Sequence, residues 1–150
     1  MQMKKPEKES RDLMSLLKDK NPYTRMQAAK AFSQLKDISA TKSIIEAYKD
    51  EDEKSIKLEM IRALSRILLE GRKTLMERMK DDDNEVATAA TQELMRIGGP
   101  SAVTDLELEI VNFLNDVISR SEDSETKSIA INTLVELAYP SKKHSKSESK

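Results

Sequence analysis

The stretch of sequence that decides the fold is NPYTRMQAAKAFSQL, residues 21–35. Its apolar side chains fall three, four, seven and ten places after Arg25. Residues at these offsets lie on one face of an α-helix, because a helix completes a turn about every 3.6 residues. Asn21 in front of Pro22 is typical of a helix start, since asparagine caps the first turn and proline loses no hydrogen bond there. The stretch therefore predicts an amphipathic helix that begins at Pro22.

The same pattern occurs four times along the chain. The anchors equivalent to Arg25 are Lys57, Ala87 and Lys127, which follow at spacings of 32, 30 and 40 residues. The residue before each anchor is β-branched, and the four offsets after it are mostly apolar. The residues predicted to face the core are Ala28, Met60, Ala90 and Ala130; Ala29, Ile61, Thr91 and Ile131; Phe32, Leu64, Leu94 and Leu134; and Leu35, Ile67, Ile97 and Leu137. The sequence thus contains four copies of one helix.

A second apolar helical stretch precedes each copy, at residues 13–17, 44–48, 75–79 and 106–117. Charged turns join the two stretches of each pair. Two further helix starts are marked by Asp83, a candidate cap, and by Thr104 with Glu107, which fit a capping box. The segment Gly98-Gly99-Pro100 is typical of a helix stop and a loop, and it accounts for the 40-residue spacing.

These pairs of helices predict an all-α fold, a short α-solenoid (superhelix) of about four helical hairpins. One hairpin cannot bury its own apolar face, but hairpins stacked side by side can. We expect residues 11–139 to form the solenoid. Residues 1–10 and 140–150 are rich in Lys, Glu and Ser and are expected to be disordered.

The stretch from Asn21 to Phe32 resembles the second helix of a HEAT repeat, whose pattern is an Asp or Asn, a Val followed by Arg, two alanines and a Leu. The third copy is similar but has Ala87 where the family has arginine, and the second and fourth copies have Lys57 and Lys127 there. The resemblance spans about residues 13–138 and is closest to the short HEAT-like repeats found in phycobilisome-lyase-type proteins. It implies a curved stack that serves mainly as a protein-binding scaffold, and it implies no catalytic residue.

The composition argues against an enzyme and against a cofactor. The 150-residue chain has no cysteine and no tryptophan, so disulfides, thiolate zinc sites and thiol nucleophiles are excluded. Its one histidine, His144, lies in the C-terminal tail, so the predicted solenoid lacks the common general bases. The sequence has no glycine-rich phosphate loop. We therefore expect no catalytic, cofactor-binding or metal-binding residues, and an enzyme ranks third among the functions considered.

The acidic turn over residues 81–85 does not fit a calcium loop, because the glycine and the distant glutamate of that pattern are missing. A capping role explains the turn.

No apolar run approaches the roughly 20 residues that span a bilayer, and the first residues lack the apolar core of a signal peptide. These features predict a soluble, cytoplasmic protein.

The repeat register also predicts which residues face away from the core. Positions five and nine after the anchors are all polar: Lys30, Arg62, Gln92 and Asn132, then Gln34, Arg66, Arg96 and Glu136. The HEAT resemblance implies that the second helices line the concave side, where these positions would form two parallel rows. Arginine pairs well with carboxylates and phosphates. The predicted partner-binding residues are Lys30, Gln34, Arg62, Arg66, Gln92 and Arg96, and the alternative is that the rows are only a solvated face.

A protein partner with an acidic segment is the favoured ligand of these rows. The alternative is a nucleic-acid-associated protein that uses the same arginines together with the lysine-rich tail. That tail carries four lysines against one glutamate, which leaves a net charge of −4 for residues 1–139. Phosphate binding usually needs a cationic excess, so the charge balance counts against nucleic acid. We expect no membrane partner and no small-molecule substrate.

Overall fold

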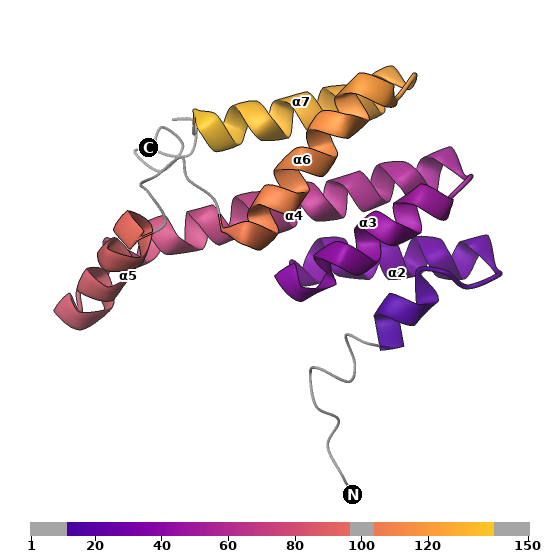
Figure 1. Ribbon diagram of the computed structural model, residues 1–150. Coiled ribbons are helices and arrows are strands. Elements are labelled where there is room, and N and C mark those ends of the chain that lie inside the picture. Colours follow the sequence, from indigo (N-terminus) through magenta and orange to yellow (C-terminus); the bar gives the residue numbers. More distant parts are fainter. Residues whose placement is uncertain (1–11, 97–103, 140–150) are drawn as a thin grey trace, which may run out of the picture.

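A computed structural model of the chain describes residues 12–96 and 104–139. Within these residues the secondary structure is all-α, with helices joined by short turns, and the predicted α-solenoid fold is confirmed (Figure 1). A short helix over residues 12–16 comes first. It is followed by α2 (Pro22–Leu35), the 3-10 helix η1 (Ile38–Ala40), α3 (Thr41–Asp50), α4 (Lys54–Arg78), α5 (Asn84–Arg96), α6 (Asp105–Arg120) and α7 (Ser124–Ala138).

The helices begin where the capping residues predict. The side chain of Asn21 accepts a hydrogen bond from the Tyr23 N–H at 2.9 Å, with proline at the first helical position. This bond satisfies one of the backbone donors that a helix start leaves free. The predicted caps are present at all three places: Asn21 on α2, Asp83 on α5, and Thr104 with Glu107 as a capping box on α6.

The helices form two layers. In one layer α2 packs against α4, and α4 packs against α7. The other layer contains α3 and α6, which also pack against each other. The hairpins α3–α4 and α6–α7 therefore lie next to each other in the stack, after the N-terminal hairpin that ends with α2 (Figure 1).

The third predicted hairpin departs from this row. The second helix of copy two and the first helix of copy three are one continuous helix, the 25-residue α4, and residues 75–78 of the predicted stretch form its end. The only helix-breaking residue between the two stretches is Gly71, and a helix tolerates one glycine at a cost of about 1 kcal/mol. Helix α5 packs at the far end of α4 and lies apart from the row (Figure 1). The place beside α4 that the register assigns to α5 is taken by α7.

Most predicted core residues are buried, among them Ala28, Phe32, Met60, Leu64 and Ala130. Thr91 and Leu134 are half-buried, and two residues are exposed: Leu35 at 55% and Ile131 at 44%. The prediction was wrong for these two because they lie on the outer sides of α2 and α7, at the two ends of the row, where no further helix of the described residues covers them. The side chain of Leu94 and all of Ile97 fall outside the described residues.

Other predictions concern residues that the structure does not describe. The expected disorder of residues 1–10 and 140–150 and the expected loop at Gly98-Gly99-Pro100 belong to this group. Among the described residues, no helix combines the length and the apolar character that crossing a membrane requires.

Candidate protein-binding surface

The predicted rows are assembled in part by the packing of α2 against α4. Lys30 and Gln34 come from α2, and Arg62 and Arg66 occupy the same register positions on α4. Lys30, Gln34 and Arg66 are exposed, and Arg62 is half-buried. We call this set of four residues the α2–α4 row. Two neighbouring helices therefore present three cations and an amide on the side of the layer that faces away from the core.

Arg62 is already engaged within the molecule. Its guanidinium lies 3.5 Å from a carboxylate oxygen of Glu59 and 3.5 Å from one of Glu125, and its side chain is 41% exposed. Glu125 belongs to α7, so this arginine connects α4 to the next helix in the layer. Exposed ion pairs of this kind stabilise a fold by about 0–1 kcal/mol. Arg62 therefore has a structural partner that competes with any ligand.

Lys30 and Arg66 differ from Arg62, because neither forms an ion pair within residues 12–96 and 104–139. Other exposed cations between neighbouring hairpins do have acidic partners, as in the pairs of Lys18 with Glu46 and Lys36 with Glu70, each at 3.4 Å. Lys30 and Arg66 are thus the cations of the α2–α4 row that can accept an anionic partner without first breaking a salt bridge.

Gln92 and Arg96 do not join the row. Both lie on α5, which packs at the far end of α4. Gln92 is exposed, and the side chain of Arg96 is outside the described residues. The expectation that these two residues continue the rows beside Arg62 was wrong, because α7 packs there instead and brings Asn132 and Glu136. Whether any of the six residues binds a partner stays a prediction.

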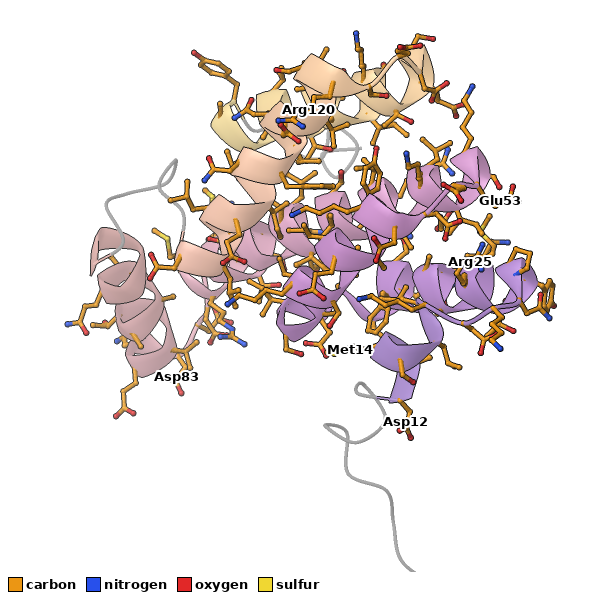
Figure 2. The ribbon with its side chains drawn as sticks, turned by 45° about the vertical axis from the view of Figure 1, so that its right-hand side comes forward. Asp12, Met14, Arg25, Glu53, Asp83 and Arg120 are labelled. Carbon is orange, nitrogen blue, oxygen red and sulfur yellow. The ribbon has the colours of Figure 1, made fainter. Side chains whose placement is uncertain are left out.

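The start of α2 is joined to the next hairpin by the ion pair of Arg25 and Glu51. The Arg25 Nε atom lies 2.8 Å from Glu51 Oε1, and its Nη2 atom lies 3.1 Å from Glu51 Oε2. The contact is therefore bidentate. Figure 2 shows Arg25 close to Glu53, at the end of the molecule where α2 and α4 both begin. Burial alone would raise the pKa of Glu51, but hydrogen bonds from Arg25 and from the Glu53 N–H outweigh it, and the pKa is lowered. The anchor arginine therefore holds two hairpins together.

A similar contact joins the α3–α4 turn to the α6–α7 turn. Lys54 Nζ lies 2.7 Å from Asp123 Oδ1. Hydrogen bonds from Lys54 and from the Thr126 side chain and backbone lower the pKa of Asp123 to about 2. Because Lys54 starts α4 and Asp123 caps α7, this pair again shows that the hairpins of α4 and α7 are direct neighbours.

A cleft of about 420 Å³ lies between these two turns. Lys57 stands over the ring of Tyr48 at 5.1 Å, and this ring meets Phe113 edge-on with centroids 5.0 Å apart. The other cations of the cleft are paired as well, Lys54 with Asp123 and Arg120 with Asp116 at 2.8 Å. The pair of Lys54 and Asp123 joins two hairpins, and the pair of Arg120 and Asp116 lies within α6. These cations of the cleft already have partners within the chain, so the α2–α4 row is the better candidate for binding.

Sequence reasoning did not identify the turn acids Glu51 and Asp123 as contacts between hairpins. The available signal was that three of the four anchors are basic and that three of the four turns in front of the copies are acidic. This regular placement of opposite charges indicates pairing between units, although it does not say which turn meets which helix.

Residues 4–65 match a protein family described as HEAT repeats. The matched segment includes α2, α3 and the first half of α4, which are the helices of the first two hairpins. No curated protein matches the sequence significantly. The repeat match over the first two hairpins and the stacked helical hairpins of the structure together show that this part of the chain is similar to HEAT repeats.

Proposed function

We propose that this chain is a non-catalytic scaffold that binds a segment of a partner protein. The proposed binding surface is the face of the α2–α4–α7 layer that points away from the core. HEAT repeats generally mediate protein interactions. Lys30 and Arg66 are the main contacts in this proposal, with Gln34 and Arg62 beside them. The favoured partner segment is acidic, because carboxylates match the geometry of arginine and the charge of lysine.

The observation that carries the proposal is the state of Lys30 and Arg66. Both are exposed on helices that pack against each other, and within the described part of the chain neither is neutralised by an acidic neighbour. Packed helices hold the backbone of both residues in place, so little ordering of the scaffold is required when a partner binds. Gln92 and Arg96 are left out of the proposed surface because α5 does not extend the row.

The test uses two matched double variants of the tagged full-length chain. Lys30→Glu with Arg66→Glu reverses the row, and Lys49→Glu with Lys80→Glu makes the same change in net charge at exposed positions of other elements. Each protein is used to capture partners from a lysate of its source, with and without nuclease treatment, and the bound proteins are quantified. We expect at least one protein to be retained by the wild type and by the control pair, and to be lost from the row variant.

Two results would contradict the proposal. If every captured protein binds the row variant as well as it binds the control, the row is only a solvated surface. If all binding disappears after nuclease treatment, and falls steeply as salt rises from about 50 to 200 mM, nucleic acid is the partner.

A further inference from the structure

The outer side of α7 carries two exposed apolar residues. Ile131 and Val135 are 44% and 54% exposed and lie four residues apart, on one side of the helix. The exposed residues from Ser128 to Ala138 are all uncharged, and the half-buried Lys127 lies one turn before Ile131. In a chain of which 35% is charged, this part of α7 is low in charge. Depletion of charge is typical of the central part of protein interfaces.

The repeat register shows what this side of a second helix does inside the stack. Ile131 and Val135 are four and eight places after the anchor. The equivalent residues of the preceding helices are Ala29 and Ser33 on α2 and Ile61 and Ser65 on α4, and their exposed fractions are between 0% and 7%. The Ser65 hydroxyl is hydrogen-bonded to the hydroxyl of Thr133 on α7 at 2.7 Å. These positions therefore receive the next helix of the row, and on α7 they have received none among the described residues.

The opposite end of the row exposes the matching positions. Thr133 and Leu137, six and ten places after the anchor, are 5% and 8% exposed, and Thr133 meets the preceding helix α4. The equivalent residues of α2 are Ala31, which is half-buried, and Leu35, which is 55% exposed. One end of the stack thus presents the positions that receive a helix, and the other end presents the positions that such a helix contributes.

The segments that form the two ends also differ in charge. Residues 12–37 contain five basic and three acidic residues, and Lys18, Arg25 and Lys36 among them pair with acids of the next hairpin. Residues 104–139 contain two basic and eight acidic residues. Opposite potentials favour encounter and fix orientation between two such surfaces. The chain's own ends are poor covers for the apolar pair, because residues 1–11 and 140–150 have six and five charged residues. Charged side chains are costly to place against an apolar surface.

We propose that a second copy of this chain docks head to tail on the first. The outer side of α2 in one copy, with Leu35 at its centre, packs on Ile131 and Val135 of the other. The contact repeats the packing by which α4 receives α7 within one chain. Because the two contact surfaces are different, one copy leaves a free surface at each end, and the association continues into short linear chains.

The test places one glutamate on either contact surface of the full-length chain. Leu35→Glu changes one end and Val135→Glu the other, and both residues are more than half exposed, so neither change is expected to disturb the fold. Ala89→Glu, at an exposed position of α5, is the matched control. Sedimentation velocity is recorded at low salt between about 10 μM and 1 mM, the range in which weak interfaces associate.

We expect the mean mass of the wild type and of the control to rise with concentration above the 17.0 kDa of one chain. Each single variant is expected to stay at that mass. An equimolar mixture of Leu35→Glu and Val135→Glu is expected to reach a twofold mass and no more, because only one intact pair of surfaces remains. The proposal is overturned if the wild type stays at the mass of one chain throughout. It is also overturned if Leu35→Glu associates like the wild type. That result would indicate a symmetric dimer in which two copies pair through their α7 surfaces, because Leu35 takes no part in such a contact.

Discussion

Arg25 and Glu51 show how single side chains set the position of neighbouring hairpins. The Glu51 side chain is 1% exposed and that of Arg25 is 19% exposed, so both charges are largely removed from water. A bidentate pair fixes orientation as well as distance, because two parallel hydrogen bonds allow little rotation. The same arginine donates to the Asp19 and Lys20 carbonyl oxygens at 2.8 and 3.2 Å, which ties the turn in front of α2 to this contact.

Replacing Glu51 with alanine is expected to lower the free energy of unfolding by about 1.5–3 kcal/mol, because Arg25 would lose two charge-assisted hydrogen bonds to a buried carboxylate. Urea denaturation followed by circular dichroism measures this change. Asp52→Ala removes a carboxylate from the next, exposed position and is expected to cost less than about 0.5 kcal/mol. Equal losses for the two variants would show that the ion pair does not stabilise the stack.

Asp123 is expected to make the stability of the fold depend on pH in acid. Its pKa is about 2 in the folded chain, below the ordinary 3.8, so unfolding takes up protons between these values. The stabilisation is therefore complete above about pH 3.8 and is lost as the pH falls towards about 2. The lowered pKa of Glu51 acts in the same direction.

Asp123→Asn is expected to flatten this part of the profile, measured as the free energy of unfolding at a series of pH values. Asparagine still caps α7, so the helix start is preserved. Asp82→Asn, in the exposed turn before α5, makes the same amide change and leaves the pair with Lys54 intact. A profile for Asp123→Asn that coincides with this control would contradict the assignment.

At the scale of the helices, local signals were sufficient to predict the starts of α2, α5 and α6, because each cap acts within its own first turn. The continuity of α4 could not be predicted from the repeat pattern, since residues 68–74 contain neither proline nor a pair of glycines. The place of α5 also could not be predicted. Two helices with the same apolar face compete for α4, and the choice depends on how well the rest of the stack packs.

For the candidate site too, local features could be predicted from the sequence and contacts between distant helices could not. The exposure of Lys30 and Arg66 follows from helical periodicity alone. The long-range partner of Arg62 is Glu125, 63 residues later in the sequence, and it is a neighbour only because α7 takes the place beside α4. A contact of this kind depends on the order of the helices in space and has no local signal.

The burial of the residue one place before each repeat anchor compares α5 directly with the helices of the stack. Ile56 of α4 is 2% exposed and Val86 of α5 is 38% exposed, although both occupy the same position of the repeat. Ile56→Ala is expected to cost about 2–4 kcal/mol of stability, because it leaves a cavity in the core. Val86→Ala is expected to cost less than about 1 kcal/mol. Denaturant unfolding of the two variants checks the difference, and a larger loss for Val86→Ala would place α5 in the core.

At the scale of the molecule, residues 12–96 and 104–139 form a compact row of helices with α5 outside it. Buried residues join α2, α3, α4, α6 and α7 into one hydrophobic core, and the single buried apolar residue described on α5, Ala90, is not part of it. Regions with little buried apolar contact open more easily than the rest of a protein. The stability of the chain is accordingly uneven along its length.

Native-state hydrogen exchange is expected to show this unevenness. The central amides of α5 should exchange faster than those of α2, α4 and α7, because α5 can open without exposing the core. Helix α7 is the appropriate control, since it lies nearer to the C-terminus and would be expected to exchange first if fraying from the chain end decided the rates. Equal protection of α5 and α7 would contradict the arrangement.

The position of α5 has a practical consequence for attaching probes. The turn at residues 81–83 is exposed at the start of a helix that stands apart from the core (Figure 2). The chain has no cysteine, so Asp82→Cys would provide one unique thiol for a fluorophore or for immobilisation on a surface. A label at this point projects away from the outer sides of α2 and α7, and single-molecule imaging of the chain can follow assembly while both ends stay accessible.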